Sequence, residues 1–413
     1  CDWSSDVCSS DLEAVRKELN ALGFPDEELM VGGLIVRTTL EKDAQTAAEA
    51  AVFNQAPKNA PDDLHIGLIS IRPGTGEIVA MFGRKDYLER QLNDATQAIT
   101  QAGSTFKPFA LIAALEQGIS LATIWNGDGP KIFDDQLGRP YEVSNYGNKA
   151  FGDVSLLRAT ANSINTIFVP LGMKVGPDKV IDAARRAGIP EEIAMVPTPS
   201  VVLGVASPHV IDVANAFATF AANGVKAKPF LVKEVMGSNK GVLYESRIVT
   251  EQVFDESVIA DLNYALGEVV RAGTASSALR GFGRPAAGKT GTSQSNASAW
   301  FTGYTPQLAT SVAFFRDDAT QSLNGIGGLN SVTGGSFPAR IWNAYMKVAL
   351  KDQPVMEFLP PTNIGGVDAV PIPNPVPTIS PADAAQWCAT ADLTGVEKSL
   401  AEFCDKATKK LKS

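Results

Sequence analysis

A serine and a lysine lie three residues apart in the stretch AGSTFKPFALIAALEQG, which covers residues 102–118. The run from Phe109 to Leu115 is continuously apolar and is followed by a glycine, as expected for a buried helix. Proline is tolerated in the first turn of such a helix, so Pro108 places Ser104 and Lys107 on one face near its N-terminus. Unpaired backbone N–H groups at that end can also stabilise an oxyanion.

Ser104 is a candidate nucleophile and Lys107 its candidate base. A serine hydroxyl becomes a good nucleophile only when a base takes its proton, and a neutral amine can do this. At an unperturbed pKa near 10.4, only about one lysine in 2,500 is neutral at pH 7, so the site must lower that pKa by burial or by a second cation. The pattern alone is weak, because a serine that merely caps a helix looks the same.

Two further motifs contain candidate site residues. Ser163-Ile164-Asn165 offers a hydroxyl that can pass a proton and an amide that can hold a substrate, but Ser322-Leu323-Asn324 has the same pattern. Lys289-Thr290-Gly291-Thr292 combines a cation, two hydroxyls and a glycine, with strands predicted after it. As an edge strand this segment could lie along an extended substrate and bind its carboxylate. The alternative is an exposed turn before a strand.

The order of these motifs resembles that of penicillin-binding proteins and class A β-lactamases, whose signature is S-x-x-K, a Ser-x-Asn element and K-T-G. The motifs begin here at residues 104, 163 and 289, and the rival at residue 322 comes too late in the chain. The chain is most similar to the transpeptidase region of class A penicillin-binding proteins of the actinobacterial type. Further stretches that carry this resemblance are residues 33–40, 91–95, 102–108, 141–146, 300–306 and 334–342.

The resemblance implies an α+β fold of the penicillin-binding protein/serine β-lactamase type, in which a helical subdomain packs against an antiparallel five-stranded sheet. It implies that Ser104 attacks the penultimate D-Ala carbonyl of a peptidoglycan stem peptide, with Lys107 as base and Ser163 as proton shuttle. Asn165 would hold the peptide amide, and the backbone N–H groups of Ser104 and Thr292 would form the oxyanion hole. The terminal carboxylate, or that of a β-lactam, would bind the segment formed by Lys289, Thr290, Gly291 and Thr292.

An amine from a neighbouring stem peptide would then resolve the acyl-enzyme. The chain is therefore expected to be a D,D-transpeptidase that β-lactams acylate, acting on the extracytoplasmic face of the cell membrane. A class A-like β-lactamase is a rival, but Ile164 replaces the acid of its Ser-Asp-Asn element and no deacylating glutamate can be placed. A D,D-carboxypeptidase would use water as acceptor, and a penicillin-sensing domain would be acylated without cross-linking. One departure from the family is Ser298, which stands where an acid is common.

Composition excludes several other classes. The 413 residues, 45% hydrophobic and 20% charged, are enough for a packed core. The net charge of −9 is spread along the chain and argues against nucleic-acid binding. Two distant histidines and four cysteines in two distant pairs leave no metal-ligand cluster, and no cofactor is expected. No apolar run of about 18 residues is present, so this fragment is expected to be soluble. The family resemblance implies a parent protein that is anchored in the membrane through a missing N-terminal part.

Four segments are expected along the chain. Residues 1–12 have no regular period and resemble a non-native junction, and residues 13–64 resemble a linker after a missing glycosyltransferase domain. The transpeptidase domain is expected over 65–350, and a Pro-rich spacer with a helical tail over 351–413, where Cys388 and Cys404 could form a disulfide. Helices are expected at 13–23, 40–52 with Thr39 as cap, 109–115, 156–169, 179–187, 210–222 and 257–272, and strands at 34–38, 65–71, 77–82, 299–304 and 309–315.

Overall fold

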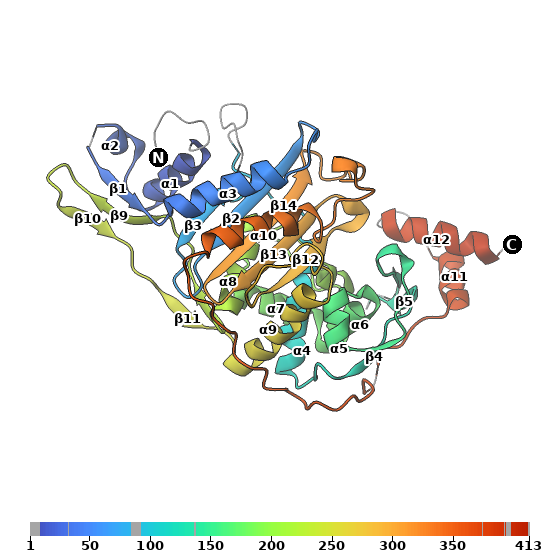
Figure 1. Cartoon of the computed structure of the whole chain (residues 1–413). Helices are drawn as coiled ribbons and strands as arrows, with labels where there is room; N and C mark the ends of the chain where they lie inside the picture. The colour runs from blue at the N-terminus through green and yellow to red at the C-terminus, as the bar shows by residue number, and fades with distance from the viewer. Residues whose placement is uncertain are drawn as a thin grey trace.

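A five-stranded antiparallel sheet forms the centre of the protein, with strand order β12-β13-β14-β2-β3 (Figure 1). The computed structural model describes residues 9–31, 33–83, 92–135, 138–373, 375–391, 393 and 398–411. Because helices cover both faces of the sheet, β13 and β14 are buried along almost their whole length. The strands are β2 (Leu64–Ile71), β3 (Ile78–Phe82), β12 (Ala287–Thr292), β13 (Ala299–Thr305) and β14 (Leu308–Arg316).

Two helices from distant parts of the chain cover one face of this sheet. They are α3 (Lys42–Gln55) and α10 (Phe337–Ala349), which pack against each other as well as against the strands. The opposite face is covered by α8 (Val210–Ala221), whose side chains are all buried except that of Ile211. The α+β fold with a five-stranded antiparallel sheet, predicted from the family resemblance, is confirmed.

The helical part of the molecule is built around α4 (Lys107–Glu116). Every residue from Lys107 to Leu115 is buried, because α4 packs against three other helices of this layer and against the 3-10 helix Gly103–Phe106. The buried helix expected at 109–115 is therefore confirmed. The other helices of the layer are α5 (Leu156–Asn162), α6 (Asn165–Val175), α7 (Pro177–Ala187) and α9 (Glu256–Arg271).

The single helix expected over 156–169 is wrong. The chain forms two helices instead, α5 and α6, because Ser163 adopts the left-handed conformation with φ 56° and ψ 44° and Ile164 is extended. Ser163 ends α5 through its backbone N–H, which donates to the carbonyls of Ala159 and Thr160. Hydrophobic periodicity continues across this break, so the pattern of apolar residues could not reveal it.

The N-terminal region contains α1 (Ser9–Ala21), α2 (Asp26–Val31) and β1 (Ile35–Thr38). Strand β1 pairs with β9 (Val232–Met236), which pairs in turn with β10 (Val242–Glu245), and the three form a small sheet. Helix α1 begins within residues 1–12, where no regular structure was expected, and residues 1–8 lie outside the described part. The other predicted helices and strands are confirmed to within a few residues.

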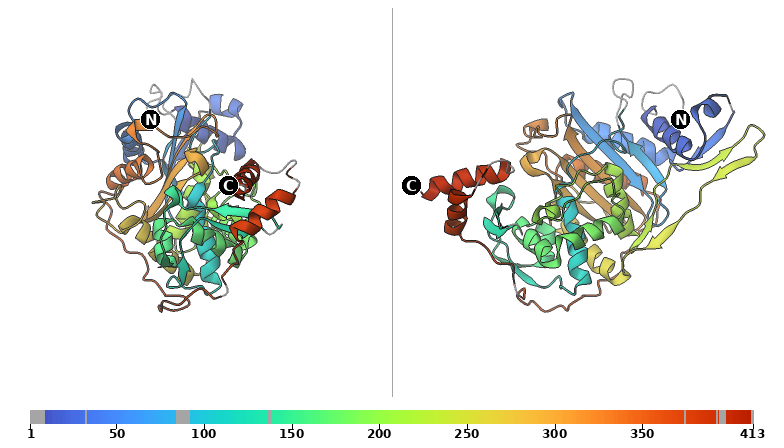
Figure 2. Two further views of the ribbon diagram at one scale, coloured as in Figure 1. Left: turned by 90° about the vertical axis from the view of Figure 1, so that its right-hand side faces the viewer. Right: turned by 180° about the vertical axis from the view of Figure 1, so that it is seen from behind.

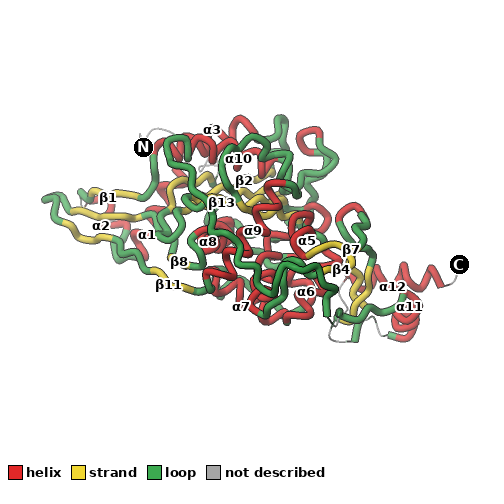
Figure 3. Tube along the Cα trace, turned by 60° about the horizontal axis from the view of Figure 1, so that its bottom comes forward, coloured by secondary structure: helices red, strands yellow, loops and turns green. Residues whose placement is uncertain are grey.

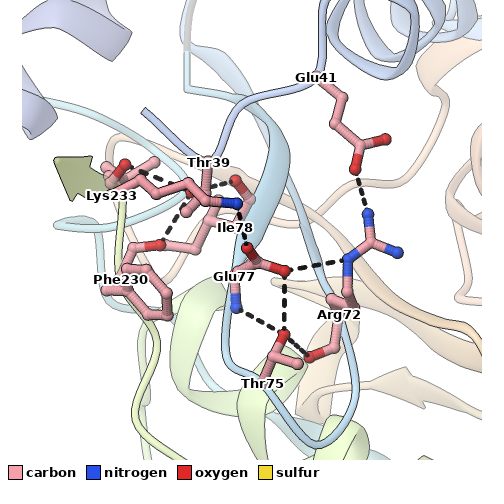
Figure 4. A network of polar contacts seen from close by, with 9 residues as sticks. Thr39, Glu41, Arg72, Thr75, Glu77, Ile78, Phe230 and Lys233 are labelled. Atoms are coloured by element: carbon pink, nitrogen blue, oxygen red, sulfur yellow. Dashed lines mark hydrogen bonds and ion pairs between the residues drawn. The ribbon is translucent and has the colours of Figure 1, made fainter. Parts of the chain in front are cut away.

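Thr39 does not cap the helix that follows it. Its hydroxyl instead donates to the carbonyls of Ile78 and Phe230, at 2.8 and 3.1 Å, and so holds the segment before α3 against β3 (Figure 4). Glu41 occupies the position before α3, and its carboxylate pairs with the guanidinium of Arg72.

Between α10 and α11 (Pro381–Thr390) the described residues form no helix, and α12 (Lys398–Leu411) follows α11. Asp261 on α9 holds the segment between α10 and α11, because its carboxylate accepts hydrogen bonds from the backbone N–H groups of Thr362, Asn363 and Ile364 at 2.6 to 2.9 Å.

A disulfide joins Cys388 on α11 to Cys404 on α12. Figures 2 and 3 show α11 and α12 at the end of the molecule opposite α1 and α2. Among the described residues there are also three small two-stranded sheets, β4 (Ile124–Asn126) with β7 (Asp153–Ser155), β5 (Lys131–Asp134) with β6 (Pro140–Val143), and β8 (Val225–Ala227) with β11 (Thr250–Gln252).

Candidate active site

Ser104 lies half-buried in the 3-10 helix that leads directly into α4. Gly103 before it is left-handed, with φ +57°, and a Cβ atom there would lie 2.7 Å from the carbonyl carbon and oxygen of Thr292. Only glycine tolerates both this conformation and this approach. Gly103 therefore sets the backbone beside Ser104 against the backbone of Thr292, which is the arrangement that an oxyanion hole made of their N–H groups would need.

Lys107 is completely buried at the start of α4. Its Nζ donates to the carbonyl oxygen of Ser163 and to Oδ1 of Asn165, both at 2.6 Å, and lies 3.0 Å from Ser163 Oγ. A continuous helix would place residues 163 and 165 about 200° apart around its axis, on different faces. The break at Ser163 is therefore what lets both side chains meet the same amine. The Asn165 amide is oriented in turn by donating to the carbonyl of Ser144 at 2.9 Å.

Lys289 is the second buried amine of the site. It lies on β12, and its Nζ donates to Ser163 Oγ at 2.8 Å and to the carbonyl of Thr290 at 3.1 Å. The hydroxyl of Ser163 thus contacts both amine nitrogens. The structure brings all three sequence motifs together around this one oxygen.

Burial and mutual repulsion favour the neutral form of these amines. Burial lowers the pKa of Lys107 well below its usual value, and the positive charge of Lys289 lowers it further. Burial also lowers the pKa of Lys289, to about 7. Within the described ranges no Asp or Glu side chain forms an ion pair with either lysine. The site therefore suits an anionic ligand and keeps one amine available as a base.

Ser104 Oγ and Lys107 Nζ are not hydrogen-bonded in this structure, since the hydrogen bonds of Lys107 all go to Ser163 and Asn165. Hydrogen bonds between catalytic groups are often long or misaligned before substrate binds. The two residues still share the first turn at the N-terminal end of one buried helix, with the hydroxyl partly exposed and the amine behind it.

Thr290, Gly291 and Thr292 lie on the outer strand of the sheet. β12 pairs with β13 along one side, with Lys289 opposite Thr302 and Thr292 opposite Ala299. The expected edge strand is therefore correct and the alternative of an exposed turn is wrong. A Cβ atom at Gly291 would lie 2.6 Å from the carbonyl oxygen of Ala102, so this glycine lets β12 pack directly behind the nucleophile segment.

The rival motif Ser322-Leu323-Asn324 lies away from the two lysines. The Leu323 backbone N–H donates to the carbonyl of Asn296 at 2.7 Å, at the turn between β12 and β13, and the Leu323 side chain is buried. Its serine and asparagine have no contact with Lys107 or Lys289.

Sequence reasoning did not predict several contacts that shape the site. Ser298 Oγ and Trp300 Nε1 both donate to the carbonyl of Gln101, at 2.6 and 2.8 Å, and so hold the segment just before the nucleophile. The backbone N–H of Gly334 donates to Thr292 Oγ1 at 3.4 Å, and Thr274 Oγ1 lies 2.6 Å from Thr290 Oγ1. The family resemblance had drawn attention to Ser298 and to residues 300–306 and 334–342, but it did not give these contacts.

Across the described residues, no three His, Cys, Asp or Glu side chains are grouped as metal ligands. In the same part of the chain, no helix has both the length and the apolar character needed to cross a bilayer.

Comparisons with known proteins agree with this geometry. Residues 67–317 match the family described as "Penicillin binding protein transpeptidase domain". Penicillin-binding protein 1A of Mycobacterium tuberculosis is 33% identical over 393 residues, which are 90% of this chain and 46% of that protein. Penicillin-binding protein 2D of Bacillus subtilis is 31% identical over 86% of this chain and 50% of its own length. The chain thus spans about half the length of these curated relatives.

Among solved structures, PonA1 from Mycobacterium tuberculosis in complex with penicillin V matches with a TM-score of 0.78 and 31% identity. This match covers 90% of this chain and 100% of that one. The fold is therefore shared with a protein whose structure was solved in complex with penicillin V.

Proposed function

Because the chain belongs to the penicillin-binding protein transpeptidase family, we propose that it is a D,D-transpeptidase that cross-links peptidoglycan stem peptides through an acyl-enzyme on Ser104. The observation that carries this proposal is the position of Ser163, whose hydroxyl lies 3.0 Å from Lys107 Nζ and 2.8 Å from Lys289 Nζ. Two buried amines joined by a hydroxyl can move a proton and still present positive charge to a substrate carboxylate.

In the acylation step, Ser104 Oγ attacks the carbonyl carbon of the penultimate D-Ala while its proton passes to neutral Lys107. The negative charge on the carbonyl oxygen is stabilised by the backbone N–H groups of Ser104 and Thr292. The bond from this carbon to the terminal D-Ala nitrogen then breaks. Ser163 delivers a proton to the leaving amine and takes the proton held by Lys107, 3.0 Å away. An amine of a second stem peptide then attacks the ester carbonyl and gives up a proton to Lys107, and the ester C–O bond breaks as Ser104 Oγ takes this proton.

The donor's terminal carboxylate binds Lys289, Thr290 and Thr292, and its backbone lies along β12 at Gly291. Asn165 Oδ1 accepts from Lys107 and one N–H of its Nδ2 donates to the Ser144 carbonyl. The second N–H of Nδ2 can hold the peptide amide by donating to its carbonyl oxygen. A β-lactam carries a carboxylate and a strained amide in similar positions, and it acylates the same serine. The β-lactamase alternative is disfavoured because, within the described residues, no acid pairs with the site lysines to activate a deacylating water.

The proposal also covers the setting and extent of the domain. The substrate lies outside the cell membrane, and a disulfide such as Cys388–Cys404 persists in oxidising compartments, so the chain would act on the extracytoplasmic face. Residues 65–350 would form the transpeptidase domain, and residues 351–413 an appended spacer and helical tail.

Mass spectrometry after incubation with a fluorescent penicillin tests the proposal. We expect one adduct on the peptide that contains Ser104, lost in Ser104→Ala and retained in the control Ser322→Ala, which changes the serine of the rival motif. Incubation with a D-Ala-D-Ala peptide and an amine acceptor should release D-Ala and give the cross-linked product. Rapid loss of the adduct with penicillin turnover would indicate a β-lactamase, and D-Ala release without cross-linking would indicate a carboxypeptidase. Acylation without any action on the peptide would indicate a sensor.

A further inference from the structure

Thr274 lies beside the strand proposed to receive the substrate carboxylate. It follows α9 in the loop that leads to β12, and its exposed side chain places Oγ1 at 2.6 Å from Thr290 Oγ1. Its backbone is held on both sides. The Thr274 N–H donates to the carbonyl of Ala161 at 3.1 Å. On the other side lies Gly335, where an added Cβ atom would be 2.3 Å from the carbonyl oxygen of Thr274.

The direction of a hydroxyl's proton decides whether it can bind an anion. A carboxylate only accepts hydrogen bonds, and a threonine hydroxyl has one proton to donate. At Thr292 the direction is settled by the backbone N–H of Gly334, which can only donate, so the Thr292 proton is free for a ligand. At Thr290 the partner is another hydroxyl, and either oxygen can be the donor.

If Thr290 donates its proton to Thr274, Thr290 presents only oxygen lone pairs to a carboxylate, and the two groups repel each other. If Thr274 donates to Thr290 instead, Thr290 can donate its own proton to the ligand. The two hydrogen bonds then run in series from Thr274 to the ligand, and each strengthens the other. Lys289 already uses two of its N–H groups on Ser163 and on the Thr290 carbonyl. When Lys289 is protonated, only one N–H remains for the ligand, so the contribution of Thr290 matters.

We infer that Thr274 is a positioning residue for the carboxylate of the acyl donor, acting by donating its hydroxyl proton to Thr290 so that Thr290 can donate to the substrate. This inference rests on the proposed function, because it takes the ligand at β12 to be a carboxylate. It assigns a substrate-recognition role to the loop between α9 and β12, outside the three motifs.

The test compares acylation of Ser104 by a penicillin with acylation by its methyl ester, which cannot present a negative charge. In Thr274→Val, which keeps the shape and removes the hydroxyl, we expect the second-order rate constant for the penicillin to fall about five- to tenfold, as for the loss of one hydrogen bond between uncharged groups. The rate constant for the ester should change less than twofold, so the preference for the free acid falls. Thr274→Ser should restore this preference.

Two further variants separate this role from a structural one. Ser276→Ala removes the hydrogen bond from Ser276 Oγ to the Gly273 carbonyl in the same loop, without touching Thr290, and should leave the preference unchanged. In Thr290→Val, adding Thr274→Val should cause no further loss. An equal fall for both ligands in Thr274→Val, or no fall for either, would overturn the inference while leaving the proposed function intact. Absence of any Ser104 adduct in the unmodified protein would instead overturn the proposed function, and this inference with it.

Discussion

The rate of Ser104 acylation should rise with pH as Lys107 loses its proton, and we call this rise the acid limb of the pH profile. Replacing Lys289 by methionine should move the acid limb to higher pH. Both amine nitrogens bind Ser163 Oγ, at 3.0 and 2.8 Å, so they lie no more than about 5.8 Å apart. At an effective dielectric constant of about 20, two unit charges at this distance repel by about 3 kcal/mol. This repulsion favours the neutral, basic form of Lys107 when Lys289 is charged.

The sign and size of the shift follow from this repulsion. Without the Lys289 charge, Lys107 holds its proton about a hundredfold more tightly, at about 1.4 kcal/mol for each factor of ten. The pKa of Lys107 therefore rises, and neutral Lys107 first appears at a pH up to about two units higher. Burial, the larger cause of its lowered pKa, remains, so the pKa should not return to the value of an exposed lysine.

The assay measures the acylation rate constant from about pH 5 to pH 10 with a penicillin methyl ester, so that lost carboxylate binding does not enter. Only the position of the acid limb is compared, not its height. Thr290→Val is the control, because it removes a carboxylate contact but no charge and should leave the limb in place. A limb in Lys289→Met within a few tenths of a pH unit of the original would refute the coupling between the two lysines.

Three further predictions concern stability and backbone geometry. Burial lowers the pKa of Lys289 to about 7 in the folded protein, below the pKa of the same lysine in the unfolded chain. The contribution of Lys289 to the free energy of unfolding should therefore rise with pH from about 7 to 10. Lys289→Met should flatten this rise and raise the stability at pH 7 by on the order of 1–4 kcal/mol in urea unfolding, and a destabilised variant would contradict it. Gly103→Ala should lower Ser104 acylation at least a hundredfold, because its Cβ would meet the Thr292 backbone, whereas Gly118→Ala, with no neighbour within 4 Å, should leave acylation within a few-fold. Near-normal acylation in Gly103→Ala would show that this contact is not needed. Asp261→Asn, which removes a charge that three backbone N–H groups bind, should speed hydrogen exchange at residues 362–364 by about tenfold or more, and unchanged exchange would show that this carboxylate does not hold the tail.

Local signals in the sequence were sufficient for most of the helices and strands. The buried run of α4 and the strands β2 and β3 depend on residues close together in the chain, and they were predicted correctly. The break between α5 and α6 was not. Ser163 is a non-glycine residue in the left-handed region, a conformation that costs free energy and persists only where surrounding contacts hold it. Those contacts include Lys107, which lies 56 residues away in the sequence.

The sequence by itself determined the chemistry of this protein, namely which side chains are present and the order in which the three motifs occur. A nucleophile, two amines and an amide are properties of residue type, and short spacings such as that from Ser104 to Lys107 carry over directly into helix geometry. Only the tertiary structure decided that the Ser163 hydroxyl contacts both amines and that Gly103 packs against the backbone of Thr292. It also decided that Thr274 meets Thr290. These contacts connect residues that lie from 16 to more than 100 positions apart in the sequence. Their distances depend on how helices and strands pack, which no local pattern encodes.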